Sequence, residues 1–271
     1  MDNVGQMRPV MPVRPLAGYV GGKRQLAKQL IAKMADIPHG LYAEAFVGMG
    51  GVFFRRSLAP RVEVINDYNR DIANLFRVLQ RHYQAFLDML KWQLASRAEF
   101  ARLLQVDADS LTDLERAARF LYLQRLSFGG KVAGRSFGID TTNSSRFDMT
   151  KLGSMLEDVH ERLAGVTIEC LDWRIFFDRW DRPQTLFYLD PPYWGTENYY
   201  PRGLFGSDDH QALAERLRGL KGKFVLTMND TPQTRACYGG FHIEAVELTY
   251  SAGGAHKQVA AREIVVSNWP G

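Results

Sequence analysis

The sequence predicts an α/β protein whose doubly wound, Rossmann-like sheet is interrupted by an inserted, mainly helical lobe. Short apolar, strand-like runs occur near both ends of the chain, within 41–66 and again within 166–267. Between them, at about 75–150, leucine, isoleucine and phenylalanine recur with the helical period of about 3.6 residues. The simplest arrangement is one sheet formed by both ends of the chain, with the middle inserted into it.

Local patterns define the expected elements along the chain. Apolar spacing of three and four residues predicts helices over 23–34, 52–58, 70–94, 110–126, 151–163 and 208–220. Short apolar runs predict strands over 41–47, 62–66, 166–170, 185–189, 223–228, 241–248 and 263–267. Ser110 and Ser207 are the expected N-caps of the helices that they begin or precede. The glycine-rich range 128–142 predicts a hairpin or long loop.

Composition and charge limit the class of protein. Apolar residues make up 46% and charged residues 24% of the 271 positions, as in soluble globular proteins. The net charge of +4 suits a polyanionic partner without demanding one. Two cysteines, Cys170 and Cys237, argue against a disulfide framework or a paired-cysteine metal cluster and favour a reducing, cytoplasmic setting. No apolar run approaches the roughly 18 residues of a membrane span, so we expect no membrane anchor.

The strongest chemical signal is Asp190-Pro191-Pro192-Tyr193, which directly follows an apolar strand. Proline cannot continue a central strand, so Asp190 is expected at the strand's carboxyl end, where open α/β sheets bind ligands. The lone pair of an aromatic amine is delocalised into its ring. The Asp190 carboxylate and the Pro191 carbonyl can accept the two amino hydrogens and orient that lone pair, while Tyr193 can stack on the base. The alternative is a strand followed by a structural proline turn.

A glycine-rich run between a strand and a helix predicts a nucleotide-type ligand. It contains Glu44, Phe46, Gly48 and Gly50, and it permits close backbone approach. Phe53 stands where the dinucleotide fingerprint has its third glycine, so NAD binding is weakly supported. A plain glycine turn is the alternative.

Two further segments belong with this run. Asp67 ends the next expected strand, at the distance where an acid commonly accepts ribose hydroxyls, and helix capping is its alternative. Tyr19 precedes the segment Gly21-Gly22-Lys23-Arg24, which is not a phosphate loop. Ala17 replaces the first glycine of that motif, and Arg24 replaces the Ser or Thr that binds magnesium.

In their order and spacing, these motifs resemble the Dam-like, or alpha-group, DNA adenine-N6 methyltransferases over about 19–268. Ala45 departs from this family, which has proline there. The resemblance implies that S-adenosyl-L-methionine is the cofactor. It also implies that Lys23 lies near the donor's carboxylate, that Glu44 and Phe46 flank its methionine part, and that Asp172 and Trp173 contact its adenine. A capped turn with a core tryptophan is the alternative for the last pair. The implied cofactor-binding residues are Tyr19, Gly22, Lys23, Glu44, Phe46, Gly48, Gly50, Asp67, Asp172, Trp173 and Asp190.

Composition, the order of the expected elements and the resemblance together predict the domains. We expect a flexible arm at 1–15, a methyltransferase catalytic domain at 16–74 and 151–271, and a target-recognition domain at 75–150. Double-stranded DNA is the expected partner, with the target adenine flipped out of the helix. We expect no metal requirement, and a partner nuclease stays open.

Basic residues in the insertion support DNA binding. From 116 to 151 there are seven Lys or Arg and two acids, so the local charge is 7 − 2 = +5. Lys131 and Arg135, beside glycines, are expected to reach base edges, and Arg125 and Arg146 are expected to bind DNA as well. A solvated basic face is the alternative.

Two other functions stay open at this point. An RNA adenine methyltransferase can share the sheet and the Asp-Pro-Pro-Tyr motif, and a DNA-binding relative can lack catalysis. The family's better-known members carry asparagines and an Asn-x-x-x-Arg stretch where this chain has 128–135, so the recognised DNA site is not predicted.

Overall fold

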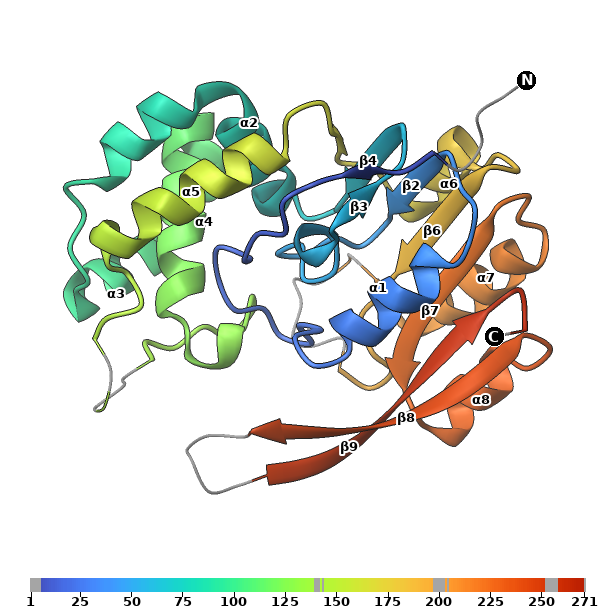
Figure 1. The fold of residues 1–271 in the computed structure, drawn as a ribbon. Coiled ribbons are helices and arrows are strands. Elements are labelled where there is room, and N and C mark those ends of the chain that lie inside the picture. Colours follow the sequence, from blue (N-terminus) through green and yellow to red (C-terminus); the bar gives the residue numbers. More distant parts are fainter. Residues whose placement is uncertain are drawn as a thin grey trace.

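The computed structural model describes residues 6–138, 142, 144–196, 203, 205–251 and 258–270 (Figure 1). Residues 1–5 of the expected arm and 139–141 of the expected hairpin lie outside this part of the chain. A seven-stranded sheet lies on one side in Figure 1, and a group of helices lies on the other.

The sheet has the strand order β5-β4-β2-β6-β7-β9-β8. Its first five strands are parallel neighbours, while β9 pairs antiparallel with both β7 and β8. The strands are β2 (Leu41–Glu44), β4 (Val62–Asn66), β5 (Thr167–Glu169), β6 (Thr185–Leu189), β7 (Lys223–Asn229), β8 (His242–Ser251) and β9 (Gln258–Ser267). The predicted α/β class with a Rossmann-like sheet is therefore confirmed.

Both faces of the central strands are buried, which explains their continuous apolar runs. On β2 and β6, Tyr42 and Tyr188 belong to one core, while their neighbours Ala43 and Phe187 belong to the other. Helix α1 (Ala27–Ala35) contributes to the first core. The second core takes side chains from α6 (Trp173–Trp180), α7 (Ser207–Arg218) and α8 (Pro232–Cys237).

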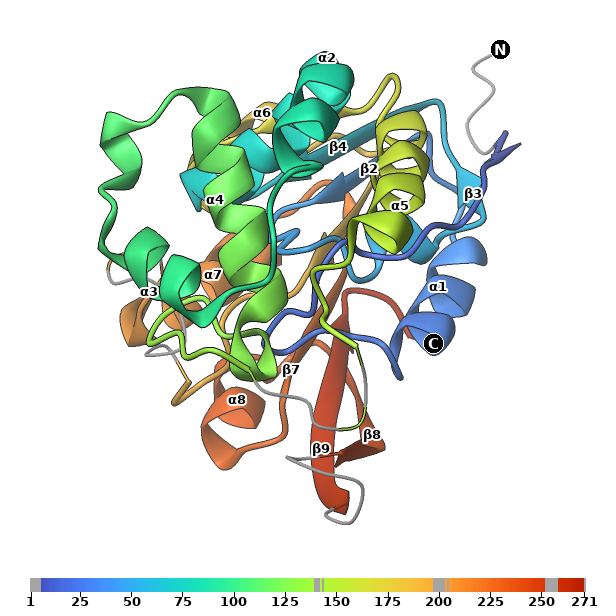
Figure 2. The ribbon, with the colours of Figure 1, turned by 90° about the vertical axis from the view of Figure 1, so that its left-hand side faces the viewer.

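Four helices, α2–α5, form a group beside the sheet (Figure 2). They are α2 (Arg70–Leu90), α3 (Arg97–Gln105), α4 (Asp113–Leu126) and α5 (Met149–Arg162). Helix α2 packs against α4 and α5, and α3 packs against α4. The expected domain boundary at 74/75 falls inside α2, and α5, expected in the catalytic domain, packs within this group. A role of the group in target recognition stays a prediction.

Part of the expected N-terminal arm, residues 8–13, contacts the rest of the chain. Strand β1 (Arg8–Pro9) pairs antiparallel with β3 (Leu58–Ala59). The amides of Val10 and Val13 donate to Ser57 O and Phe54 O at 2.9 and 2.7 Å, and Val13 is buried. The composition of the segment does not predict these contacts, because they are made with distant residues. In Figure 1 the segment, in dark blue, continues between the helical group and the sheet toward α1.

Other differences from the prediction are local. The helix expected at 52–58 is a short 3₁₀ turn, η1 (Phe53–Arg55), followed by β3. Thr112, rather than Ser110, caps α4 in a capping box with Glu115. Gly206 precedes α7, and its amide donates to Asp209, so Ser207 is not the cap. Helices α3, α6 and α8 were not predicted, and α6 and α8, with eight and six residues, are too short for a clear helical period. Within the described residues, no helix is both long and apolar enough to span a membrane.

Candidate active site

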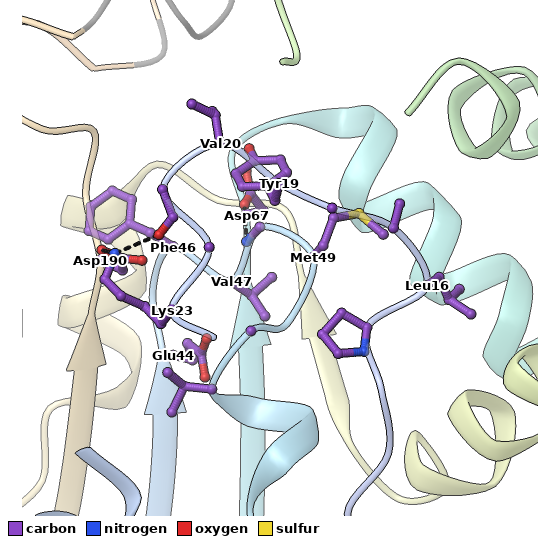
Figure 3. Close-up of a pocket in the computed structure, with 18 of the residues that line it drawn as sticks. Leu16, Tyr19, Val20, Lys23, Glu44, Phe46, Val47, Met49, Asp67 and Asp190 are labelled. Carbon is purple, nitrogen blue, oxygen red and sulfur yellow. Dashed lines mark hydrogen bonds and ion pairs between the residues drawn. The ribbon is translucent and has the colours of Figure 1, made fainter. Parts of the chain in front are cut away.

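A pocket of about 890 Å³ opens at the carboxyl ends of β2, β4 and β6. The acids Glu44, Asp67 and Asp190 end these strands or directly follow them, and all three line the pocket (Figure 3). The predicted site residues in its wall are Tyr19, Gly22, Lys23, Glu44, Phe46, Gly48, Asp67, Arg125, Arg146, Trp173, Asp190 and Pro192. Parallel strand ends thus gather motifs that are far apart in the sequence.

Asp190 is held by two donors on one carboxylate oxygen. Lys23 Nζ lies 2.7 Å from Asp190 Oδ1, and Thr227 Oγ1 donates to the same oxygen at 2.9 Å. Burial raises the pKa of Asp190, whereas the ammonium of Lys23 lowers it. The other oxygen, Oδ2, accepts no hydrogen bond from the part of the chain that the structure describes. Its lone pairs are therefore available to a ligand.

Lys23 is more deeply buried than its position in a glycine-rich segment suggests. Its side chain is 2% exposed, and its Nζ also donates to Gly21 O at 2.7 Å. The same ammonium lies 4.6 Å from the centre of the Tyr193 ring. The expected contact of Lys23 with the donor's carboxylate stays a prediction, and in this structure the charge of Lys23 is already paired with Asp190.

The residues that follow Asp190 in the Asp-Pro-Pro-Tyr motif lie mostly outside the pocket wall. Pro192 lines the pocket, while Pro191 and Tyr193 do not. The next residue, Trp194, exchanges two hydrogen bonds with Asn229 at the end of β7, at 3.1 and 3.0 Å. These bonds fix the backbone after the prolines, so the motif is rigid at both ends.

The glycine-rich loop is tied to Asp67. The amide of Gly48 donates to Asp67 Oδ2 at 2.8 Å, and the amide of Asn69 donates to Oδ1 at 2.9 Å. Burial raises the pKa of Asp67 to about 6, although these two bonds oppose the shift. Asn69, rather than Asp67, is the N-cap of α2. The helix-capping alternative for Asp67 is therefore wrong.

The two predicted glycines of this loop have different surroundings. Gly48 has a φ of +52°, and a Cβ there would lie 2.9 Å from Tyr19 Cε1, at the pocket wall. Gly50 has a φ of +72°, and a Cβ there would lie 2.2 Å from Phe54 Cδ2. Gly50 does not line the pocket. Its role in this structure is to leave room for Phe54, not to contact a ligand.

Asp172 and Trp173, although adjacent in the chain, also have different surroundings. Asp172 caps α6 by accepting from the amide of Arg174 at 2.8 Å, and its side chain lies outside the pocket wall. Trp173 is buried, packs against Phe177 and lines the pocket. The cap at Asp172 agrees with the alternative of a capped turn, whereas Trp173 lies in the pocket wall, and the contacts of both residues with the donor's adenine stay predictions.

Glu44 is a buried acid in the pocket wall. Tyr42 OH donates to Glu44 Oε2 at 2.6 Å, and the side chain is 1% exposed. Burial raises the pKa of Glu44 to about 8, with Asp190 contributing in the same direction. At neutral pH Glu44 is therefore mostly protonated, and its proton can be donated to a ligand.

The four predicted DNA-binding residues do not form one exposed basic face. Arg125 donates to Leu16 O and, at 2.6 Å, to Arg146 O. Arg135 Nη2 donates to Gln124 Oε1 at 3.0 Å, and its guanidinium lies 5.2 Å from the Phe120 ring centre. Burial lowers the pKa of Arg135 to about 10. These two arginines bind protein groups because the chain folds back on α4, which sequence spacing does not reveal.

Lys131 and Arg146 remain nearer the surface. Lys131 is half-buried and does not line the pocket. Arg146 is exposed, lines the pocket and donates from Nη1 to Ser127 O at 3.3 Å. Their DNA contacts stay predictions.

The sequence analysis missed several residues of the site. Tyr68 and Leu171 line the pocket, each directly beside a predicted residue, and Thr227 holds Asp190. For Tyr68 the available signal was its place in Asn66-Asp67-Tyr68-Asn69. For Thr227 it was a hydroxyl within an apolar strand that is buried on both faces. Among the described residues, no group of three or more His, Cys, Asp or Glu is arranged to hold a metal ion.

Comparisons with known proteins agree with this geometry. A family model described as D12 class N6 adenine-specific DNA methyltransferase matches residues 19–252. The chain is also 26% identical, over 277 residues, to the type II methyltransferase M1.LlaDCHI of Lactococcus lactis subsp. cremoris. That alignment covers 95% of this chain and 96% of the relative. The chain therefore belongs to the D12 class of N6 adenine-specific DNA methyltransferases, as its motifs predicted.

Proposed function

We propose that this enzyme transfers the methyl group of S-adenosyl-L-methionine to the N6 atom of an adenine that is flipped out of double-stranded DNA. The proposal rests on one observation. Asp190 lines the same pocket as the glycine-rich loop that contains Gly48, and the amide of Gly48 in this loop donates to Asp67. One end of the pocket thus offers acceptors for an amine, and the other offers a glycine-rich loop for a nucleotide-type donor.

The pocket's chemistry fits the donor. Its volume of about 890 Å³ lies within the range of small-molecule sites. Asp67 has acceptor lone pairs beyond those used by the two backbone amides and can bind ribose hydroxyls. Phe46 and Trp173 supply apolar walls. When bound, the donor supplies an electrophilic methyl group, and no metal is needed for its transfer.

The residues at the end of β6 would prepare the amine. Asp190 Oδ2 and the Pro191 carbonyl would each accept one amino hydrogen, which directs the nitrogen lone pair away from the ring plane and toward the methyl group. Lys23 and Thr227 hold the carboxylate in place through Oδ1, so the acceptor is fixed before the base arrives. As the N–C bond forms, the methyl–sulfur bond of the donor would break and leave a neutral thioether, while the nitrogen becomes positively charged and gives up one proton. The ionised Asp190 is the nearest acceptor for it.

The biological setting is proposed from the relative alone. M1.LlaDCHI is named as a type II methyltransferase, and we propose that this chain likewise modifies one DNA site in a restriction–modification system. Sequencing methylated adenines in DNA from cells that express the protein identifies that site.

The catalytic proposal is tested with Asp190→Ala and, as a matched control, Asp178→Ala. Asp178 is an exposed acid on α6 outside the pocket. We expect Asp190→Ala to abolish methyl transfer to duplex DNA while donor affinity, measured by calorimetry, stays within a few-fold of the wild type. The control should retain both. Near-normal turnover of Asp190→Ala removes Asp190 from the reaction and contradicts the mechanism.

A further inference from the structure

Most cations that line the pocket are already bound to protein groups. Lys23 is paired with Asp190, and Lys151 lies 3.5 Å from Asp148. Arg125 and Arg146 donate to backbone carbonyls. The positive charge of these four side chains is therefore at least partly satisfied within the protein.

Arg14 and Arg24 line the same pocket, and no hydrogen bond or ion pair within the described chain holds either guanidinium. Arg55, which also lines the pocket, donates to a single backbone carbonyl, that of Gly51. No acid of the described chain forms an ion pair with any of the three. A guanidinium keeps its charge under all physiological conditions, so an uncompensated group of them attracts an anion.

The three arginines are close enough to act together. Arg55 Nη1 donates to Gly51 O at 2.5 Å, beside the backbone of Lys23, which directly precedes Arg24. Burial lowers the pKa of Arg55, and the neighbouring charges of Arg24 and Arg14 lower it further. Mutual repulsion of this kind is relieved when an anion binds between the groups.

Their positions place this charge at the opening of the pocket. Arg14 and Arg24 are exposed although they line the pocket, so they belong to its rim, while Arg55 is half-buried and lies further in. Lys23 directly precedes Arg24 in the chain, and its partner Asp190 lines the same pocket.

We propose that Arg14, Arg24 and Arg55 form a binding site for a phosphate of the DNA strand that carries the target adenine. This inference rests on the proposed function. A flipped nucleotide enters the pocket but stays joined to its strand on both sides, so its phosphates remain at the opening. The planar guanidinium binds phosphate oxygens with two parallel hydrogen bonds.

The donor's carboxylate is the competing anion, and the arrangement favours phosphate. The donor's carboxylate belongs to a ligand that would lie inside the pocket, whereas two of the three arginines are exposed at its rim. A chain of phosphates outside the pocket can reach exposed side chains and can use several cations at once.

The test uses the full-length variants Arg14→Gln and Arg24→Gln, with Arg218→Gln as the matched control. Arg218 is exposed on α7 and does not line the pocket. Affinity for a duplex that the wild type methylates, and for an unrelated duplex, is measured between 50 and 200 mM salt. Each rim variant should weaken binding to both duplexes and lower the salt slope by about one. Between 50 and 200 mM salt, the DNA affinity of each rim variant should therefore fall by a factor about three- to fourfold smaller than the factor for the wild type. Donor affinity, measured by calorimetry, should not change.

Each alternative outcome is decisive. An unchanged salt slope with weaker donor binding assigns the cluster to the donor's carboxylate and overturns the phosphate site. An unchanged slope with unchanged donor binding shows that the cluster binds neither anion. If the wild type methylates DNA and the variants keep its salt slope, only the phosphate site fails. If the wild type methylates no duplex, the proposed function itself fails.

Discussion

Lys23 Nζ and Asp190 Oδ1 lie 2.7 Å apart and join the N-terminal glycine segment to the carboxyl end of β6. Both side chains lie away from solvent, with exposed fractions of 2% and 21%. An ammonium at this distance opposes the rise that burial causes in the pKa of Asp190, and it holds one carboxylate oxygen in place. Lys23 is thus a positioning residue for Asp190, a role that its motif did not predict.

Replacing Lys23 should change the pH dependence of methyl transfer. Without the ammonium, the pKa of Asp190, already raised by burial, rises further. The ionised form is then lost at higher pH. For Lys23→Met we expect the acid limb of the kcat/KM profile to move upward by about 1–3 pH units. Lys23→Arg, which keeps the charge, should shift it much less. Equal acid limbs in all three proteins contradict this role.

Glu44 should make the protein less stable as the pH rises. Its pKa is about 8 in the folded protein, above the ordinary 4.5, so its stabilising contribution is complete below about pH 4.5. That contribution is lost as the pH rises to about 8. The stability of Glu44→Gln relative to the wild type should therefore increase over this range. Urea unfolding at pH 5, 7 and 9 measures the difference, with the exposed Glu247→Gln as control. A constant difference at all three pH values argues against a protonated Glu44.

Asp67 should make donor binding sensitive to acid. Its pKa is about 6, and only the ionised carboxylate can accept from the Gly48 amide, the Asn69 amide and a ligand together. We expect donor affinity to fall as the pH drops through about 6. At pH 8, Asp67→Ala should weaken binding by about 1–3 kcal/mol. Asp172→Ala is the comparison, because Asp172 lies outside the pocket wall and its loss should leave affinity unchanged. If calorimetry shows that Asp172→Ala weakens donor binding and Asp67→Ala does not, then Asp172 binds the donor and Asp67 does not.

Gly129 and Gly130 offer a matched pair for testing backbone contact. Their φ angles are +66° and +67°, so alanine carries the same conformational cost of about 1–2 kcal/mol at each. A Cβ at 129 meets nothing within 4 Å, whereas at 130 it lies 2.8 Å from the backbone of Gly18. Gly130→Ala should therefore be clearly less stable than Gly129→Ala in urea unfolding. Equal losses mean that residues 18 and 130 do not pack closely.

Lys131 and Arg135 should differ, although the sequence predicted the same function for both. Arg135→Ala loses its bond to Gln124 and its contact with the Phe120 ring, which should lower the free energy of unfolding by about 1–3 kcal/mol. Lys131→Ala should leave stability nearly unchanged and relax discrimination between the methylated site and single-base variants. If Lys131→Ala loses turnover equally on the methylated site and on all single-base DNA variants, then Lys131 contacts only phosphates and reads no base.

The sequence alone determined the fold class and the family, and most of the residues that it predicted for the site line the pocket. Strand β6 and Asp-Pro-Pro-Tyr were recognisable because an apolar run ending in two prolines has few structural interpretations. The glycine loop and Asp67 were recognisable because each directly follows a strand. Local signals of this kind survive without tertiary context, since the backbone conformation that they require depends on adjacent residues.

Only the tertiary structure decided which partners these residues have. Lys23 is paired with Asp190, and Arg135 with Gln124, because parallel strand ends and packed helices bring together residues distant in the chain. The cap role of Asp172 and the packing role of Gly50 depend on neighbours whose side-chain directions the sequence does not encode locally. The contacts of residues 8–13 were not predictable for the same reason, since they are made with residues 54–59 and do not depend on the composition of the segment itself.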